Sequence, residues 1–173
     1  VKLPHKFKIA VGGCPNNCVK PDLNDVGIVG QRIPRVIPEL CKGCKLCEKS
    51  CPLHVAKVVD GKAVIDPSQC NNCGRCIPKC PFHATKATGY QVYIGGRWGK
   101  RTAMGRPLSA IFTDQEELLT LIEKCLLLFR AYGQPKERFA DTITRLGFDQ
   151  VQAMLLSDEL LQRKEEILSQ PAS

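Results

Sequence analysis

Apolar and polar residues alternate only over short segments in the first two thirds of the chain, and this is the pattern of β-strands. Four such segments predict strands; they cover residues 6–11 (KFKIAV), 25–30 (DVGIVG), 90–94 (YQVYI) and 108–112. Two further short apolar segments, 55–59 and 63–65, flank the dipeptide Asp60-Gly61. A dipeptide of this kind between two strands is typical of a two-residue hairpin.

Helical spacing of apolar residues begins after residue 112. Residues 113–116 (TDQE) form a capping box, which predicts a helix that begins with Thr113 as its cap and runs to Tyr132, before Gly133. Its predicted buried face consists of Leu118, Ile122, Cys125, Phe129 and Tyr132. Two further helical segments are expected, over 135–146 and over 148–168 with a break near Ser157. Strands and helices together predict an α+β fold.

The cysteine content of the chain indicates that the protein binds metal. The chain has 173 residues and eleven cysteines, and ten of the cysteines lie at CxxC or CxxxC spacing. Metal ligands have this spacing, whereas disulfides are the alternative only for a secreted protein. We therefore predict metal-bound thiolates in a reducing, anaerobic cytoplasm. The remaining cysteine, Cys125, lies on the buried helix face and is predicted to be a core residue.

Eight of the cysteines form two copies of one motif. Residues 41–52 read CKGCKLCEKSCP and residues 70–81 read CNNCGRCIPKCP, and both match the C-x2-C-x2-C-x3-C-P run of bacterial ferredoxins. The copies are offset by 29 residues, and the likeness continues through the segments CPLHVAK and CPFHATK. The two copies therefore indicate an internal duplication.

The spacing within each copy predicts which cysteines share a cluster. Three closely spaced thiolates bind one cubane, and the fourth reaches the other cluster. The first 4Fe-4S cluster is assigned to Cys41, Cys44, Cys47 and Cys80, and the second to Cys51, Cys70, Cys73 and Cys76. Zinc is the alternative, but zinc sites use two CxxC pairs rather than four cysteines in one short run, twice. We expect a ferredoxin-like insert over 35–86, within a second domain made of 1–34 and 87–173.

The formal net charge of +8 would by itself suggest a nucleic-acid partner. Each oxidised cluster with its four thiolates contributes about −2, so two clusters bring the net charge to about +4. The basic residues are also dispersed, so no nucleic-acid binding is predicted. No stretch approaches about 18 apolar residues, so no membrane span is predicted. The first residues, VKLPHK, lack the apolar region of a signal peptide.

Residues 3–18, LPHKFKIAVGGCPNNC, are similar to the second half of the sirohaem and iron–sulfur signature of sulfite and nitrite reductases. The segments DVGIVG and GYQVYIGGRWGKR (89–101) and the helical tail resemble the same family. A two-cluster ferredoxin inserted just after this signature resembles the dissimilatory or anaerobic type. The resemblance implies the C-terminal part of a sirohaem domain, with a ferredoxin insert and a helical C-terminal tail.

The resemblance also implies a role for the first cysteine pair. In the family a C-x5-C pair and a C-x3-C pair together hold one 4Fe-4S cluster, and the last cysteine also bridges to the sirohaem iron. Cys14 and Cys18 would then be two of the four ligands, with Cys18 as the bridge. The C-x5-C pair and the family's substrate-binding Arg and Lys residues are absent here. An N-terminal half or a partner subunit is therefore expected to carry them, and this chain alone is not expected to be catalytic.

Sirohaem carries many carboxylates, so the resemblance implies cations around it. Lys6 and Lys8 lie on the predicted strand that leads to Cys14, and Arg97, Lys100 and Arg101 follow the later glycine pair. The alternative for each of these residues is a solvated surface charge.

Together these features predict electron transfer through two 4Fe-4S clusters toward a sirohaem–4Fe-4S centre, as part of a sulfite or nitrite reductase. A redox donor protein would supply the electrons. A freestanding ferredoxin-like carrier is the alternative, and in it Cys14 and Cys18 would bind nothing. A third hypothesis is a regulatory iron–sulfur protein that binds DNA or RNA, for which affinity would fall steeply with salt.

Overall fold

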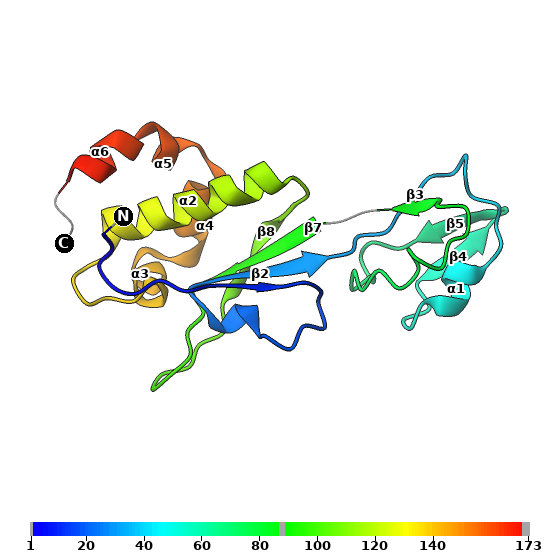
Figure 1. Ribbon diagram of the computed structural model, residues 1–173, viewed down its shortest axis with the longest axis horizontal. Helices are drawn as coiled ribbons and strands as arrows, with labels where there is room; N and C mark the ends of the chain where they lie inside the picture. Colours follow the sequence, from blue (N-terminus) through cyan, green and yellow to red (C-terminus); the bar gives the residue numbers. More distant parts are fainter. Residues whose placement is uncertain (1, 87–88, 171–173) are drawn as a thin grey trace. The chain divides into compact units, whose positions relative to one another are not determined.

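The computed structural model describes residues 2–86 and 89–170 (Figure 1). The chain divides into two compact units. The first unit consists of Val1–Gly12, Cys18–Val29 and Tyr90–Ser173, and the second of Gly13–Asn17 and Gly30–Gly89.

The first unit contains a four-stranded sheet in the order β1-β2-β7-β8. β1 (Ile9–Gly12) runs parallel to β2 (Val26–Gln31), and β7 (Gly89–Ile94) runs antiparallel to β8 (Arg106–Phe112). All six residues of β2 are buried, as expected for a central strand of apolar sequence. A short 3-10 helix, η1 (Pro21–Leu23), lies between β1 and β2. The four strands predicted for this region are confirmed, with ends shifted by up to three residues.

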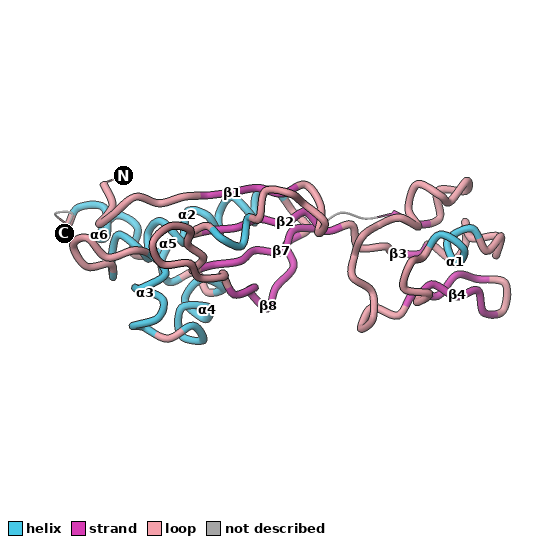
Figure 2. The backbone as a smooth tube through the Cα atoms, turned by 90° about the horizontal axis from the view of Figure 1, so that it is seen from below, coloured by secondary structure: helices cyan, strands magenta, loops and turns pink. Residues whose placement is uncertain are grey.

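Five helices follow the sheet in sequence, and Figure 2 shows them gathered together beside its strands. They are α2 (Gln115–Tyr132), α3 (Phe139–Leu146), α4 (Phe148–Leu156), α5 (Glu159–Gln162) and α6 (Lys164–Ser169). The largest core cluster is built from residues of β2, β7 and β8 and the inner faces of these helices. The break expected near Ser157 is present, because α4 ends at Leu156. None of the described helices is long and apolar enough to cross a membrane.

Two details of the helix predictions are wrong. The cap of α2 is Asp114 rather than Thr113, because the Asp114 carboxylate accepts the Glu117 N–H at 3.1 Å. The next helix begins at Phe139 and not at residue 135, because Pro135 lies in a turn. The prediction for Cys125 is confirmed: its side chain is fully buried in the core.

A buried ion pair connects the beginning of the first unit to its helices. The Asp25 carboxylate is fully buried, accepts a hydrogen bond from the Arg138 guanidinium at 2.8 Å and accepts the Lys8 N–H at 3.0 Å. Three aromatic rings pack nearby, with the Phe7 centroid 5.1 Å from that of Phe139 and 5.8 Å from that of Phe129. These contacts place the segment before β1 against α2 and α3.

The second unit has two small antiparallel ribbons and one short helix. β4 (Ala56–Val59) pairs with β5 (Lys62–Ile65), β3 (Arg35–Val36) pairs with β6 (Thr85–Lys86), and α1 covers Leu46–Ser50. The predicted hairpin is confirmed: Asp60 and Gly61 have φ of 47° and 73°, as a type I′ turn requires.

The 29-residue repeat of the sequence is also a repeat of strand pairing. Val36 pairs with Thr85, and the residues 29 positions from these two, Ile65 and Ala56, also pair with each other. The β3–β6 ribbon is therefore the counterpart of the β5–β4 ribbon. The halves differ at α1, whose Lys49 N–H donates to the Lys45 carbonyl at 3.0 Å. Pro78 occupies the position of Lys49 in the second copy and has no N–H, so that segment forms turns instead.

Candidate iron–sulfur sites

Two small cavities lie in the second unit, and each is lined by four cysteines. The first is called the Cys41 cavity, and its cysteines are Cys41, Cys44, Cys47 and Cys80. The second is called the Cys70 cavity, and its cysteines are Cys51, Cys70, Cys73 and Cys76. Each cavity thus gathers three cysteines of one motif copy and the last cysteine of the other. These are the two sets into which the sequence analysis divided the eight cysteines.

Left-handed backbone conformations shape the loop of each motif. Gly43 and Lys45 have φ of 64° and 62°, and their counterparts Asn72 and Gly74 have φ of 54° and 67°. Successive N–H groups converge in such a loop and form a concavity that suits anions, including thiolate-bound clusters. Gly43 is also required for space, because a Cβ there would lie 2.5 Å from the Gly61 carbonyl oxygen.

Backbone N–H groups donate to several of the cavity sulfurs. The Ala63 N–H donates to Cys41 Sγ and the Ala84 N–H to Cys80 Sγ, both at 3.3 Å. The N–H groups of Gly43 and Ala63 lower the pKa of Cys41, and the nearby positive charge of Lys62 acts in the same direction. The thiolate form of Cys41 is therefore stabilised by the fold itself.

Lys62 is held beside the first motif by two hydrogen bonds. Its Nζ donates to the Pro38 carbonyl at 2.8 Å and to the Cys41 carbonyl at 2.9 Å. The sequence analysis missed Lys62, Ala63 and Ala84, because their role depends on how the strands of the hairpins meet the cysteine loops.

Burial acts against the thiolate form at other cysteines. It raises the pKa of Cys76 to about 11 and also raises the pKa of Cys47. Burial acts in the same direction at Cys51, but backbone N–H groups around it, led by that of Ala56, outweigh this effect and lower its pKa. A bound metal centre is positively charged, so it stabilises thiolates and releases their protons. These buried sulfurs therefore suit metal binding.

The spacing of the cysteines does not suit a single metal ion. Tetrahedral zinc with Zn–S bonds of about 2.3 Å brings its sulfurs to about 3.8 Å from one another. Among residues 2–86 and 89–170, no group of three or more His, Cys, Asp or Glu side chains is gathered closely enough to hold one ion. All eleven cysteines are free, so the disulfide alternative is not supported either. Four cysteines around one cavity are the number of thiolates that a 4Fe-4S cubane takes.

The first cysteine pair lies in a turn. The Asn17 N–H and the Asn17 side-chain amide both donate to the Cys14 carbonyl at 3.1 Å, and Pro15 follows Cys14 at the position that proline favours in a β-turn. Cys14 is half-buried and Cys18 is exposed. Asn17 therefore helps to form the turn, and its amide is directed at the backbone.

The five predicted cations occupy different environments. Lys6, Lys8, Lys100 and Arg101 are exposed. Arg97 is 18% exposed and forms an ion pair of 2.8 Å with Asp141 of α3. Arg97 and Ala103 also pair through their backbones, so Lys100 and Arg101 lie on the loop between them.

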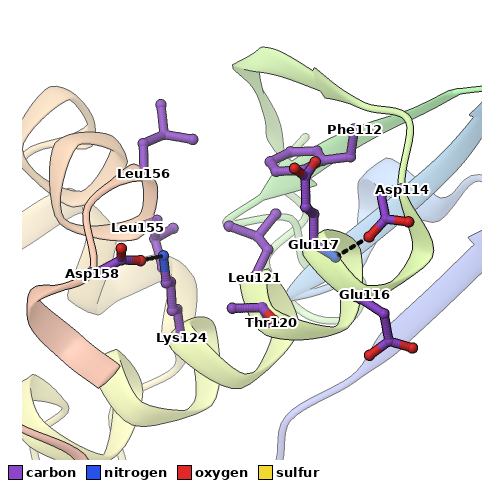
Figure 3. Close-up of a pocket in the computed structure, with 10 residues that line it drawn as sticks. All are labelled: Phe112, Asp114, Glu116, Glu117, Thr120, Leu121, Lys124, Leu155, Leu156 and Asp158. Atoms are coloured by element: carbon purple, nitrogen blue, oxygen red, sulfur yellow. Dashed lines mark hydrogen bonds and ion pairs between the residues drawn. The ribbon is translucent and has the colours of Figure 1, made fainter. Parts of the chain in front are cut away.

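A larger pocket of about 470 Å³ lies in the first unit, between the beginning of α2 and the α4–α5 turn (Figure 3). In Figure 3 Lys124 faces Asp158, and their ion pair measures 2.8 Å. Three acidic residues that line the pocket have structural roles. Asp114 caps α2, and Glu116 and Glu117 lie in the first turn of α2, where negative charge stabilises a helix. This pocket brings together no group of metal ligands.

The chain belongs to the nitrite and sulphite reductase 4Fe-4S domain family, whose model matches residues 1–164. It is therefore an iron–sulfur protein of α+β fold, as the sequence predicted.

Among curated relatives, the coenzyme F420-dependent sulfite reductase of Methanocaldococcus jannaschii is 41% identical over 149 residues, which are 84% of this chain and 24% of that protein. A subunit of the anaerobic sulfite reductase of Salmonella typhimurium is 41% identical over 105 residues, 57% of this chain and 31% of that protein. The chain thus spans a quarter to a third of these relatives. A solved dissimilatory sulfite reductase I shares the fold, with a TM-score of 0.61 at 22% identity over 99% of this chain and 46% of that one.

Proposed function

We propose that this chain holds two 4Fe-4S clusters in its second unit and passes single electrons toward a sirohaem–4Fe-4S centre, as part of a sulfite or nitrite reductase. The observation that carries the proposal is the pair of cavities, each lined by a complete set of four cysteines. Membership of the reductase 4Fe-4S domain family and similarity to proteins named as sulfite reductases support it. We propose the domain limits 35–86 for the two-cluster insert, with 1–34 and 87–173 as the reductase domain.

The chain's own residues have defined parts in this function. The eight thiolates hold the clusters, and the clusters supply one-electron chemistry when bound. The backbone N–H groups of Ala63 and Ala84 stabilise the negative charge on two ligand sulfurs. Val58 and Ala63 of the β4–β5 ribbon line the Cys41 cavity. Ile65 of the same ribbon and Pro34, which precedes β3, line the Cys70 cavity. No substrate bond is made or broken in this unit.

Cys14 and Cys18 are proposed as two ligands of a third 4Fe-4S cluster, with Cys18 bridging to sirohaem. The exposure of Cys18 supports this, because a bridging sulfur has to be accessible to a second cofactor. The other two ligands would come from an N-terminal half or a partner subunit. Lys6, Lys8, Lys100 and Arg101 are exposed and fit the role of cations for sirohaem carboxylates. Arg97 fits less well, because it is already paired with Asp141.

Anaerobic measurement of iron and acid-labile sulfide per chain, with an absorption spectrum, tests the proposal. About eight irons and no sirohaem band are expected for the chain alone. About four irons, or one zinc per four cysteines, would contradict the two-cluster function.

Alkylation tests the first cysteine pair against the freestanding-carrier alternative. In the chain alone, Cys14 and Cys18 should react with iodoacetamide readily, while the eight cavity cysteines resist. When the missing part of the reductase is added, both should become protected. If they stay reactive in the assembled enzyme, this chain is a carrier that makes no use of them.

A further inference from the structure

The two cavities are related by the sequence repeat, and one of the equivalent positions at which they differ carries a backbone N–H in one copy only. Ala63 lies against the Cys41 cavity, and the residue 29 positions earlier, Pro34, lies against the Cys70 cavity. The shared pairing of the ribbons supports this equivalence, because the pairs Val36–Thr85 and Ile65–Ala56 are in the same register. The same offset relates Cys41 to Cys70 and Lys62 to Ile33.

This difference decides whether a backbone N–H at this position can donate to the first cysteine of the motif. Backbone N–H groups also donate to Cys51 of the Cys70 cavity and to the equivalent Cys80 of the Cys41 cavity, so those bonds do not distinguish the two cavities. The Ala63 N–H donates to Cys41 Sγ at 3.3 Å. Ala63 is paired with Val58 in the β4–β5 ribbon, and the Val58 N–H donates to the Glu48 carboxylate, so these N–H groups point away from the ladder. Pro34 has no N–H, so the equivalent bond to Cys70 cannot form.

The charges around the two cavities also favour a more negative cluster in the Cys41 cavity. Each cavity is lined by one exposed cation, Lys42 or Arg75, and these balance each other. Arg32 lies beside Gly74 near the Cys70 cavity but is exposed, and solvent screens its field. Lys62 is also exposed, but two carbonyls fix its ammonium beside Cys41. The position of Lys62 is occupied by the neutral Ile33 in the other copy.

We infer that the two cluster sites have unequal reduction potentials, with the higher potential in the Cys41 cavity. Hydrogen bonds to sulfur and positive charge stabilise the reduced, more negative form of a cluster, and so raise its potential. This inference rests on the proposed two-cluster function and adds a direction to it. With both clusters bound, an electron from a one-electron donor protein would pass downhill from the cluster held by Cys51, Cys70, Cys73 and Cys76 to the cluster held by Cys41, Cys44, Cys47 and Cys80. The first cluster would be oxidised and the second reduced by this one electron, and no proton or bond would change.

Anaerobic redox titration of the chain with both clusters, followed by electron paramagnetic resonance, tests this inference. The wild-type chain should show two separate one-electron couples. Ala63→Pro copies the other half of the repeat and should lower only the higher couple, by about tenfold in equilibrium constant, which is about 59 mV. Pro34→Ala is the reciprocal variant and should raise only the lower couple.

Lys62→Met should also lower the higher couple, but only about two- to fivefold, because the side chain is exposed. Lys57→Met is its control: Lys57 is an exposed lysine on the opposite strand of the same hairpin and should leave both couples unchanged. Iron content and circular dichroism check that each variant is loaded and folded.

Three results would overturn the inference while leaving the two-cluster function intact: equal potentials in the wild type, a Lys62→Met shift confined to the lower couple, or unchanged couples in both Pro34→Ala and Lys62→Met. If Ala63→Pro fails to fold, those last two variants decide. Fewer than two clusters in the wild-type chain would instead remove the proposed function, and this inference with it.

Discussion

The two units of the molecule have cores of different chemical kinds. The first unit has one large core of aliphatic and aromatic side chains, to which both the sheet and the C-terminal helices contribute. The second unit has a small cluster of buried residues: Cys41, Cys47, Ala63, Cys76 and Ala84. Three of these five are proposed cluster ligands. A unit this small buries too little apolar surface to be stable alone, and such units usually depend on metals or disulfides. The first unit should therefore fold by apolar burial, and the second by binding its clusters.

Iron removal should show this difference most strongly. Chelation under anaerobic conditions without denaturant should unfold the second unit and leave the first folded, because only the second has ligands at the centre of its core. Amide hydrogen exchange read by mass spectrometry should show loss of protection over 35–86 and unchanged protection over α2. Far-ultraviolet circular dichroism should change little, because α2 to α6 lie in the first unit. Equal loss of protection in both units would mean that the comparison is wrong.

The buried ion pair of the first unit is the next largest expected effect. Asp25→Ala leaves the Arg138 guanidinium without its carboxylate and removes the acceptor of the Lys8 N–H. Breaking one side of a buried pair costs about 3 kcal/mol or more in free energy of unfolding. Urea unfolding followed by circular dichroism measures it.

The exposed Arg163–Glu166 pair of the C-terminal helices is the matched control. Both side chains are more than one third exposed, so solvent screens the pair and Glu166→Ala should lower the free energy of unfolding much less than Asp25→Ala does. An equal cost for the two substitutions would show that burial of Asp25 does not determine the effect.

The cap of α2 gives the smallest expected effect. Asp114→Ala removes the carboxylate that accepts the Glu117 N–H and should cost about 1 kcal/mol. Thr113→Ala, one position earlier, should change the free energy of unfolding little. A larger loss of stability in Thr113→Ala than in Asp114→Ala would show that Thr113 is the cap.

Most of the helices and strands could be predicted from the sequence, because they follow from strong local patterns. The assignment of the eight cysteines to two clusters follows from a local pattern too, and it stays a prediction. The ferredoxin spacing, the Asp60-Gly61 turn and the break at Ser157 each depend on a few adjacent residues. The sequence does not distinguish Thr113 from Asp114 as the cap of α2, because both residue types can cap a helix. The backbone conformation determines which side-chain oxygen faces the free N–H. Pro135 misled the helix prediction for a related reason, since proline suits both a first helical turn and a loop turn.

The contacts of the cluster sites with their surroundings were beyond sequence reasoning. The repeat offset does align Ala63 with Pro34, but only the strand register shows that the Ala63 N–H faces a sulfur and not the neighbouring strand. The role of Lys62 likewise depends on its reaching two carbonyls of the first motif, more than 20 positions earlier in the chain.

The most direct test of the central claim concerns which cysteines share a cluster. Cys47→Ser, Cys80→Ser and Cys76→Ser would be prepared anaerobically, and the reduced clusters followed by electron paramagnetic resonance. Cys47 and Cys80 lie 33 residues apart, yet both line the Cys41 cavity, so their variants should lose the same signal. Cys76→Ser should lose the other signal. If Cys80→Ser loses the same signal as Cys76→Ser, each motif copy binds its own cluster and the crossed assignment is contradicted.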